Sequence, residues 1–325
     1  MATSRTADYP GTALLQRVPE LPGDFTVPTC MSDLTVVVVT YNSGHCMPAL
    51  MAGLQQAPNV ILVDNGSEDD TIAAAEQARP GVAVIRNGRN LGFGAANNRA
   101  LATVSTRYAL LMNPDCLPTP EFFTALLPAA DQFPDAAIIA PHLIRRNGTP
   151  EISYRWPATI WESRGPQADG PCCVGFVCGA VMLLNMDVMR CVGFFDETFF
   201  LYYEDEDLCE RVFNAGKQIV LVPNVQVAHL SRGSVKGPAP LKSEYTRGYH
   251  HAQSKLVFQS KHYGLSNANR LRRKTLLLAL LTLIPRLLVP QPRYLARLVG
   301  RIVGLCREYP VSRNVDAWES GREQA

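Results

Sequence analysis

The sequence lacks the marks of a secreted or disulfide-stabilised protein. It has nine cysteines among 325 residues, but none are spaced as Cys-x-x-Cys, and Cys172 and Cys173 are adjacent. This arrangement fits neither a disulfide framework nor a zinc site, so we expect reduced cysteines that act as small core residues. Residues 1–33 hold no apolar segment of the kind that a secretory signal needs. We therefore expect a loose N-terminal extension and a cytoplasmic protein.

A segment long enough to cross a membrane is also missing. The longest apolar run, Thr275–Val289, covers 15 residues and contains Pro285 and Arg286, whereas a spanning helix needs about 20 apolar residues. The run is typical of a helix pair that lies on a membrane. The alternative is an amphipathic helix packed on the protein's own body, because the pattern alone does not separate the two.

Acidic residues are scarce in the last third of the chain. From Ser231 onward there are 17 Lys and Arg residues against 5 Asp and Glu, whereas the preceding residues have 14 against 24. A basic region of this length favours an anionic partner, either lipid or nucleic acid. No nucleic-acid-binding motif accompanies the charge. We therefore predict an anionic membrane surface, and no nucleic acid, as the partner of this region.

The sequence does contain a repeated alternation of buried strands and helices. Strands buried on both faces are predicted by four apolar, largely β-branched runs, Leu34–Thr40, Asn59–Asp64, Val82–Arg86 and Tyr108–Met112. Helical stretches lie between them, at about 46–56, 68–79 and 93–104. This alternation is typical of a doubly wound α/β sheet, in which ligands bind beyond the carboxyl ends of the strands.

The later part of the chain is less regular. We expect an irregular insertion over 145–172, in which Trp156 and Trp161 shape the choice of acceptor, and helices from Tyr245 onward. The other predicted elements are a strand at Phe176–Leu184, a helix at Asp207–Ala215, and strands at Gln218–Val222 and Val225–Ala228.

Polar residues follow the predicted strands where they end. The groups are Thr40-Tyr41-Asn42, Asp64-Asn65-Gly66 and Asn113-Pro114-Asp115, and the segment Asn90–Asn97 opens the helix between the last two. Each group alone is ordinary turn chemistry, and the glycine-containing helix start is a weak phosphate-binding signal. Because parallel strands end at the same edge of a sheet, their combination favours a ligand site there.

Four consecutive acids, Glu204 to Asp207, follow two tyrosines. A helix N-terminus accounts for Asp207, which can also pair with Arg211 one turn later. It does not account for Glu204 and Asp205, where partial desolvation would raise a carboxyl pKa toward that of a general base. His229 follows a predicted strand, and a lone histidine in such a place is more often structural than functional.

These motifs, in this order, resemble glycosyltransferase family 2 and, within it, the rhamnosyltransferase-like branch. The resemblance runs from about Thr35 to Ser234. Five features carry it, in this order: Asn-x-Gly-Phe at Asn90–Phe93, Asn-Pro-Asp at Asn113–Asp115, Phe-Asp-Glu at Phe195–Glu197, Glu-Asp-x-Asp-Leu at Glu204–Leu208, and the later His229. The resemblance implies a GT-A fold, which is a Rossmann-like mixed α/β sheet. It implies a catalytic domain over 34–235 and a basic helical appendage over 236–325.

The resemblance also implies roles for individual residues. Asp205, in the Glu204–Asp205 pair, corresponds to the catalytic base. Asp115 corresponds to the acid that coordinates Mg²⁺ or Mn²⁺, and His229 approaches the metal or the diphosphate. Asn113 stands where the family has the first acid of its Asp-x-Asp motif, which weakens the expected metal site. The nucleotide sugar is expected to contact Thr40, Tyr41, Asn42, Asp64, Asn65, Gly66, Asn90, Gly92, Phe93, Asn97 and Asn113.

The activity that follows is inverting transfer of a sugar from a nucleotide sugar, with dTDP-rhamnose as one candidate donor. The expected acceptor is a hydroxyl of a glycan or of a polyprenyl-linked saccharide, at the inner face of the cell membrane. One alternative is a metal-dependent nucleotidyltransferase, but the expected glycine-rich segment with Arg or Lys is missing after the first strand. The other is an inactive nucleotide-sugar-binding module, which the loss of Asp115 or Asp205 would favour; both are present.

Overall fold

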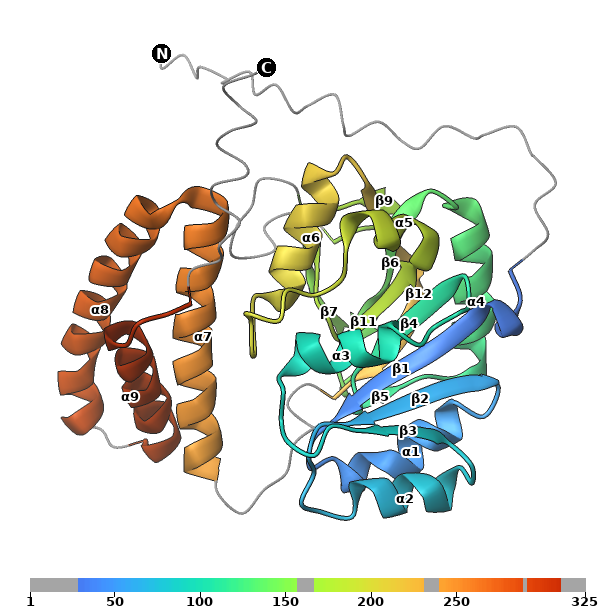
Figure 1. Cartoon of the computed structure of the whole chain (residues 1–325), viewed down its shortest axis with the longest axis horizontal. Helices are drawn as coiled ribbons and strands as arrows, with labels where there is room; N and C mark the ends of the chain where they lie inside the picture. The colour runs from blue at the N-terminus through green and yellow to red at the C-terminus, as the bar shows by residue number, and fades with distance from the viewer. Residues whose placement is uncertain (1–28, 157–166, 231–239, 289–290, 311–325) are drawn as a thin grey trace, which may run out of the picture.

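The structure is a computed structural model that describes residues 29–156, 167–230, 240–288 and 291–310. It has an α/β body and, at the C-terminal end of the described chain, a bundle of three helices (Figure 1). These are α7 (Pro240–Tyr263), α8 (Leu265–Leu288) and α9 (Pro292–Cys306). Figure 1 shows α7 next to the body and α8 on the far side of the bundle. The predicted α/β sheet with a helical appendage is confirmed.

The body is built on a ten-stranded mixed sheet. Its strands are β1 (Leu34–Thr40), β2 (Asn59–Asp64), β3 (Ala83–Arg86), β4 (Tyr108–Met112), β5 (Cys116–Leu117), β6 (Ala136–Ile144), β7 (Pro150–Glu151), β9 (Cys172–Cys173), β11 (Val181–Asn185) and β12 (Gln218–His229). The main path is β3-β2-β1-β4-β11-β6-β12-β5, with β7 on β6 and β9 on β12. Strands β1 to β4 are parallel, and β11 runs antiparallel to β4 and β6. A separate pair joins β8 (Tyr154–Arg155) to β10 (Phe176–Val177).

Helices cover both faces of this sheet, which is why its central strands are apolar on both sides. In β1, Val36 and Val38 belong to one core and Val37 to the other, and all three are fully buried. The first core receives α1 (Met47–Gly53), α2 (Thr71–Ala78) and α4 (Pro120–Gln132). The second receives α3 (Phe93–Leu101), α5 (Met186–Val192) and α6 (Glu204–Asn214).

The single strand predicted at Phe176–Leu184 is two strands, β10 and β11, because the strand is interrupted at Cys178–Ala180. Residues 176–177 pair with β8, and the main sheet is joined only from Val181 onward. The apolar character of the run does not reveal the break. Polar backbone groups cause it, since the Gly179 N–H donates to Asp205 and the Ala180 carbonyl accepts from the Asn113 N–H.

Three further element predictions need correction. The helix expected at Asp207–Ala215 begins at Glu204, where its first turn places four carboxylates at the positive end of the helix dipole. The two strands expected at 218–222 and 225–228 are one strand, β12, with an irregularity between Val222 and Gln226. The C-terminal pair of helices is a bundle of three, and α8 continues through Pro285. Trp161 and residues 1–28 of the extension predicted over 1–33 lie outside the described residues. The end of the predicted extension is ordered, since Met31–Asp33 form a short 3-10 helix and the Thr29 N–H donates to Asp131.

The bundle depends on glycines where α7 and α9 cross. A Cβ on Gly300 would lie 2.1 Å from the Tyr245 carbonyl oxygen, and a Cβ on Gly248 would lie 2.0 Å from that of Arg297. Small residues therefore let the two backbones touch. Among the described helices, none combines the length and the apolar character that crossing a bilayer requires.

Buried charge joins the bundle to the body. The Asp207 side chain is fully buried in α6 and contacts Arg211 (2.9 Å) and, from α7, Lys261 (2.7 Å) and His262 (2.8 Å). Lys261 also contacts Asp196 of the body at 2.6 Å. Burial alone would raise the Asp207 pKa, but the hydrogen bond from His262 and the charges of Arg211 and Lys261 outweigh it and lower the pKa. The helix α7 is thus packed on the body.

We predict that Asp207→Asn lowers the free energy of unfolding by about 3–5 kcal/mol, the usual effect of breaking a buried ion pair. Because the folded-state pKa is lowered, the stabilisation by Asp207 is complete above its unfolded pKa and is lost as the pH falls through the folded value. The difference between the two proteins should therefore be largest above about pH 5 and shrink below about pH 4. Urea unfolding at several pH values measures it.

Glu210→Gln is the matched control, since Glu210 lies on the same helix and has no ion pair within the described residues. A pH-independent loss in Asp207→Asn, or an equal loss in the control, would contradict this account of the contact between body and bundle.

Candidate active site

The polar residues that follow β1 and β2 lie together at one edge of the sheet. Thr40 pairs with Asp64 in the strand register, and the Asn65 N–H donates to the Thr40 carbonyl at 2.8 Å. Asp64 is buried and accepts from the Ser67 N–H at 3.2 Å. Asn42 has a φ of 52° and accepts at 2.8 Å from the backbone of the next loop. The predicted juxtaposition of the first two strand ends is confirmed.

Asn65 organises the loop before α3. Its amide nitrogen donates to the Asn90 side chain (2.9 Å) and to the Gly92 carbonyl (3.2 Å). Its carbonyl oxygen accepts from the Leu91 N–H (2.9 Å) and the Asn87 side chain (3.1 Å). An asparagine side chain has two donor hydrogens and two acceptor lone pairs, so the capacity of Asn65 is used within the protein. In this structure it holds the loop and presents no spare polar group.

Gly92 allows this loop to touch the segment that leads to the acidic helix. It has a φ of 92°, and a Cβ there would lie 2.4 Å from the Phe200 carbonyl oxygen. The Phe93 N–H donates to that same oxygen at 3.1 Å, and the Phe93 ring packs edge-on against Phe195 at 5.9 Å. The buried Asn97 donates to the Phe93 carbonyl. The Asn90–Asn97 segment is therefore fixed against residues about a hundred positions later.

A possible cation site lies beyond β4, where ligand atoms of Asp115, Cys116 and His229 lie within 4.8 Å of one another. The Asp115 carboxylate is buried, and its Oδ1 lies 3.5 Å from His229 Nε2. On its other side, His229 Nδ1 lies 3.2 Å from Glu151 Oε2. Burial lowers the pKa of His229, but the bonds to Asp115 and Glu151 outweigh it and raise the pKa. Asn113 is half-buried next to this group.

Two of the three residues, Asp115 and His229, have side chains that suit a hard divalent cation. A carboxylate and an imidazole are ligands that Mn²⁺ and related ions accept, and a ligating histidine commonly bonds a carboxylate through its other nitrogen, as His229 does with Glu151. Cys116 does not fit, because burial raises its thiol pKa well above the usual value and its sulfur donates to the Ala180 carbonyl.

The four consecutive carboxylates of α6 have four different environments. Asp205 accepts from the Gly179 N–H (3.0 Å) and the Glu206 N–H (2.9 Å). Glu206 forms an ion pair with Arg155 at 3.1 Å. Among the described residues, Glu204 Oε2 is buried with no hydrogen-bond partner. Asp207 belongs to the contact with the bundle.

These environments separate the pKa values of the carboxyls. Burial raises the pKa of Glu204 well above its usual value, and the charge of Asp205 adds to the rise. Burial also raises the pKa of Asp205, although the N–H groups of Gly179 and Glu206 partly oppose it. Burial also raises the pKa of Glu206 to about 7, although the charge of Arg155 opposes the rise. Interacting carboxyls with separated pKa values are typical of acid–base sites.

Two consecutive residues that the sequence did not single out connect the halves of the site. The Gly179 N–H holds Asp205, and the Ala180 carbonyl accepts from the Asn113 N–H at 2.8 Å. A Cβ on Gly179 would lie 3.4 Å from both Asp205 Cβ and the Phe93 ring. The interruption between β10 and β11 is therefore the place where the predicted base, the Asn113–Asp115 turn and Phe93 meet.

The acidic helix begins in a strained turn. Tyr202 and Tyr203 both have a φ of 68°, which side chains larger than glycine rarely adopt. Their rings lie 5.6 and 5.5 Å from the His251 ring of α7, and the Ser254 hydroxyl donates to the Leu201 carbonyl. The bundle therefore holds the turn that positions Glu204 and Asp205.

The structure also reveals residues that sequence reasoning missed. Glu151 and Arg155 come from the insertion that was expected to be irregular, and they contact His229 and Glu206. Asn98 bonds both the N–H and the carbonyl of Phe195. No motif marked these residues, because each depends on a contact across a long sequence separation.

Comparison with known proteins now gives the family. Residues 35–193 match the sequence profile of Glycosyl transferase family 2. The N-acetylglucosaminyl-diphospho-decaprenol L-rhamnosyltransferase of Mycobacterium tuberculosis is 30% identical over 269 residues, which covers 71% of this chain and 85% of that protein. The chain belongs to glycosyltransferase family 2. A hexosyltransferase of low-salt glycan biosynthesis, Agl10 of Haloferax volcanii, is 26% identical over 196 residues, or 56% of this chain and 62% of that protein.

Solved structures support the fold of this family 2 glycosyltransferase. GalNAc-T7, solved with UDP, GalNAc and Mn²⁺, superposes with a TM-score of 0.51 at 14% identity over 70% of this chain and 50% of that chain. Residues 1–349 of S. aureus TarS superpose with a TM-score of 0.50 at 16% identity over 74% of each chain. At these identities the likeness concerns the fold, and the predicted GT-A fold is confirmed.

We predict that Gly92→Ala lowers both turnover and stability, because the added Cβ would collide with the Phe200 carbonyl and displace the turn before Glu204. Gly88→Ala is the matched control, since Gly88 has a φ of 69° and no atom lies within 4 Å of its added Cβ. Both variants strain the backbone by about 1–3 kcal/mol, but only Gly92→Ala adds the collision. Melting temperature and sugar-transfer rate should both be lower for Gly92→Ala than for Gly88→Ala. Equal effects would show that the contact with Phe200 is unimportant.

Proposed function

We propose that this glycosyltransferase moves a sugar from a nucleotide sugar to a hydroxyl of a lipid-linked saccharide, with inversion at the anomeric carbon. The observation that carries the proposal is Asp205. It is held by the Gly179 N–H next to Glu204, and its pKa is raised by burial. The Mycobacterium tuberculosis relative is named for rhamnose transfer to a diphospho-decaprenol acceptor. An acceptor of this class, and a place in cell-envelope polysaccharide assembly, are proposed for the present chain, with dTDP-rhamnose as one candidate donor.

Asp205 is proposed as the general base. A raised pKa makes the ionised carboxylate a better proton acceptor, and the two N–H bonds fix one orientation of the group. As the acceptor hydroxyl attacks the anomeric carbon, its proton passes to Asp205 and the bond from that carbon to the diphosphate oxygen breaks. Direct displacement with one base gives inversion, since no covalent sugar–enzyme intermediate is formed. Glu204 is proposed to act on Asp205 through its charge.

Asp115 and His229 are proposed to hold a divalent cation, Mg²⁺ or Mn²⁺. Such an ion, when bound, neutralises the charge that develops on the departing nucleoside diphosphate. Glu151 is proposed to orient His229 through Nδ1, which leaves Nε2 beside Asp115, where the two residues would hold the ion. Asn113 supplies a neutral oxygen where many family members have an acid, so Asp115 provides the carboxylate of the pair.

The nucleotide sugar is proposed to lie across the sheet edge formed by Thr40, Asp64 and the loop before α3. Tyr41 and Asn42 border it from the end of β1, and Gly66, Asn90, Gly92 and Phe93 form the loop wall. Asn65 and Asn97 are proposed to act by holding this wall, because their side chains bond within the protein.

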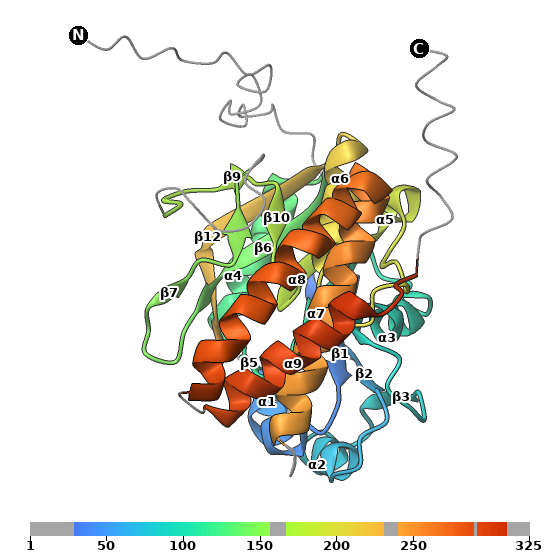
Figure 2. The ribbon, with the colours of Figure 1, turned by 90° about the vertical axis from the view of Figure 1, so that its left-hand side faces the viewer.

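An anionic membrane surface is proposed as the partner of α8. Its C-terminal half exposes large apolar side chains at helical spacing on the bundle's outer side: Leu277 60%, Leu281 58%, Ile284 64% and Leu288 78% exposed. Figure 2 views the molecule from this side and shows α8 and α9 in the foreground. Burying a leucine contributes about 1.5–3 kcal/mol, so a few such contacts hold a protein at a bilayer.

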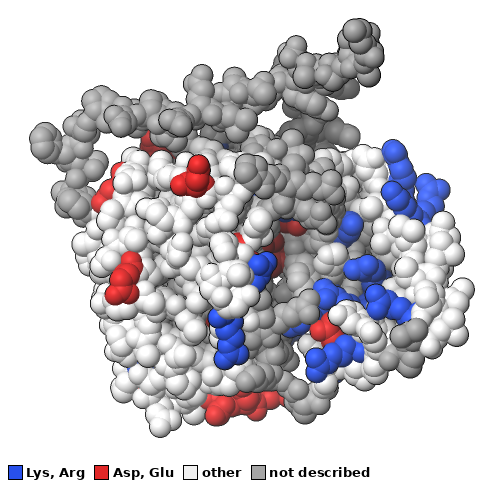
Figure 3. All heavy atoms as spheres, turned by 180° about the vertical axis from the view of Figure 1, so that it is seen from behind, with Lys and Arg blue, Asp and Glu red and all other residues white. Residues whose placement is uncertain are grey.

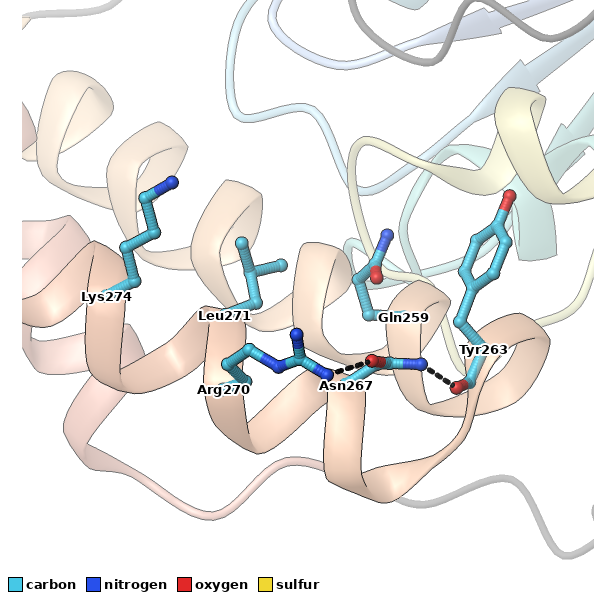
Figure 4. A pocket seen from close by; sticks show the side chains of 6 residues that line it. All are labelled: Gln259, Tyr263, Asn267, Arg270, Leu271 and Lys274. Atoms are coloured by element: carbon cyan, nitrogen blue, oxygen red, sulfur yellow. Dashed lines mark hydrogen bonds between the residues drawn. The ribbon is translucent and has the colours of Figure 1, made fainter.

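Basic residues at the other end of α8 complement this apolar face. Arg270 and Lys274 line a hollow of about 240 Å³ between α7 and α8, together with Gln259, Tyr263, Asn267 and Leu271 (Figure 4). None of these residues belongs to the predicted catalytic site. Each basic residue near an anionic leaflet adds about 1 kcal/mol of attraction. The hollow is proposed to accommodate lipid phosphate while the leucines enter the bilayer.

We predict that Asp205→Asn lowers the transfer rate at least about 100-fold, because general base catalysis is worth roughly 10²–10⁴-fold. Nucleotide affinity, measured by calorimetry, should stay within a few-fold of wild type. Glu210→Gln, on the same helix, should leave both quantities unchanged. A variant that keeps more than about a tenth of the wild-type rate would remove Asp205 from the role of base.

We predict that chelation of divalent ions stops transfer and that Mg²⁺ or Mn²⁺ restores it. Asp115→Ala should need a much higher metal concentration or be inactive, since it removes the buried carboxylate of the pair. Asp69→Ala is the control, because it removes a carboxylate that accepts from the Gly44 N–H and the Thr71 hydroxyl and does not belong to the group of Asp115, Cys116 and His229. Undiminished turnover after chelation would refute the metal assignment.

We predict that Leu281→Gln combined with Ile284→Gln weakens binding to anionic phospholipid vesicles, measured by flotation. Phe213→Gln combined with Leu241→Gln is the matched control, because these exposed residues lie on α6 and at the start of α7. High salt should release much of the wild type, as the basic contacts are screened within about 10 Å at ~0.1 M salt. Equal binding by both double variants, or no binding by wild type, would count against a membrane role for α8.

A further inference from the structure

A hollow lined mainly by aromatic rings lies where α7 meets the C-terminal end of α9. It has a volume of about 280 Å³ and is lined by Tyr245, Thr246, Tyr249 and His250 of α7 and by Arg307, which follows α9. The four side chains of α7 are half-buried and Arg307 is exposed, so the hollow opens to solvent. None of these residues belongs to the predicted catalytic site or to the proposed membrane contact.

The rings of the hollow face in two directions. Tyr245 and Tyr249 lie one helical turn apart and are nearly parallel, with 17° between their planes and 6.5 Å between their centroids. The His250 ring stands at 88° to that of Tyr249, with 5.1 Å between the centroids. Aromatic rings of this kind offer apolar faces together with a polar tip. The hollow can therefore enclose a flat, partly apolar ligand from two sides.

The packing of the bundle fixes the backbone that carries these rings. A Cβ on Gly304 of α9 would lie 2.6 Å from the Tyr249 carbonyl oxygen, so the two helices touch at this point. The Arg272 side chain of α8 donates to the carbonyls of Leu305 and Arg307, which holds the end of α9. A site on helices held in this way needs little rearrangement when a ligand binds.

The polar atoms of the hollow are not used within the part of the chain that the structure describes. The hydroxyls of Tyr245, Thr246 and Tyr249 and the ring nitrogens of His250 make no hydrogen bond with it. Burial lowers the pKa of His250, so its ring is neutral at about pH 7 and has one donor and one acceptor. A hydroxyl likewise both donates and accepts. These groups match a ligand that carries hydroxyls of its own.

The hollow differs in charge from the bundle around it. Between Pro240 and Cys306 the sequence has twelve Lys and Arg residues and one acid. Figure 3, which views the molecule from behind, shows basic side chains gathered over the bundle. Among the described residues that line the hollow, Arg307 alone is charged. A site for a polyanion would draw on the abundant cations, so the lining favours an uncharged ligand.

One wall of the hollow contacts the segment that leads to the proposed base. The Phe200 ring stacks on His250 with 4.3 Å between the centroids and 26° between the planes. The Phe200 carbonyl accepts from the Phe93 N–H at the start of α3, and Glu204 begins the acidic helix four residues later. Figure 1 shows the start of α3 on the side of the body nearest to α7. The hollow thus adjoins the turn that connects the loop before α3 to the acidic helix.

We propose that the hollow of Tyr245, Thr246, Tyr249 and His250 binds a sugar ring of the acceptor saccharide. This inference rests on the proposed transfer to a saccharide and adds a place where the acceptor is recognised. A pyranose ring has a face of C–H groups, which packs on an aromatic ring, and a rim of hydroxyls, which donate and accept hydrogen bonds. The tyrosine rings provide the first kind of contact, and the hydroxyls and the imidazole provide the second.

Titrations of full-length protein with methyl glycosides, followed by NMR, test the proposal. The glycosides are those of N-acetylglucosamine, glucose, galactose, mannose and rhamnose, and dTDP and UDP serve as probes of nucleotide binding. The variants are Tyr245→Leu, Tyr249→Leu and Tyr249→Phe. Tyr294→Leu is the matched control, because it removes an exposed tyrosine ring from α9 of the same bundle.

At least one glycoside should bind wild type, and its affinity should fall about three- to tenfold in Tyr245→Leu and in Tyr249→Leu, since each loses a ring contact. Tyr249→Phe keeps the ring and should bind more tightly than Tyr249→Leu. The control Tyr294→Leu should stay within about twofold of wild type. The affinities for dTDP and UDP should be unchanged in all variants, which also shows that the variants are folded.

The proposal is overturned if no glycoside binds wild type, if Tyr245→Leu and Tyr249→Leu bind as tightly as wild type, or if Tyr294→Leu loses as much affinity as they do. A loss of dTDP or UDP affinity in the same two variants would assign the hollow to the nucleotide of the donor and would also overturn it. Absence of sugar transfer by wild type would instead refute the proposed function, which these titrations do not measure.

Discussion

The rest of the structure depends on one constraint. Four consecutive carboxylates, Glu204 to Asp207, lie where they are poorly solvated. Taking a carboxylate out of water costs several kcal/mol unless something compensates for it. Asp207 is compensated by the charges of Arg211 and Lys261 and a hydrogen bond from His262, Glu206 by Arg155, and Asp205 by backbone N–H groups. Glu204 is left with a raised pKa. The same compensation that permits burial therefore gives each carboxyl a different proton affinity, which is what an acid–base site requires.

The compensating groups come from distant parts of the chain, and this explains the form of the fold. The Gly179 N–H donates to Asp205 and not to a neighbouring strand, and for this the strand must be interrupted between β10 and β11. Lys261 and His262 require α7 to pack on α6. The bundle thus supports the segment that carries the proposed base, because it contacts Asp207 and holds the strained turn at Tyr202 and Tyr203. The exposed leucines of α8 lie on the outer side of the bundle (Figure 1), so the membrane contact proposed for α8 is compatible with the packing of α7 on the body.

The sequence predicted the first half of the sheet well and the second half less well. Strands β1, β2 and β4 have the predicted bounds, because strands buried on both faces are continuous apolar runs with polar residues at their ends. The run through Cys178–Ala180 has the same apolar character, but its backbone bonds go to Asp205 and Asn113, which no local pattern reveals. For the same reason Glu151, Arg155 and Gly179 were missed at the site. The helix start at Glu204 was misplaced because Tyr203 adopts a conformation that is set by its packing on α7.

The central claim is that one base, Asp205, drives direct displacement at the anomeric carbon. The anomeric configuration of the first product, followed by NMR with the nucleotide sugar that the enzyme turns over, tests it most directly. The account predicts a product whose anomeric configuration is opposite to that of the donor, because a single displacement inverts the carbon. Retention of configuration would contradict the account, since it requires a nucleophile or an internal return mechanism that this arrangement of Asp205 and Glu204 does not provide.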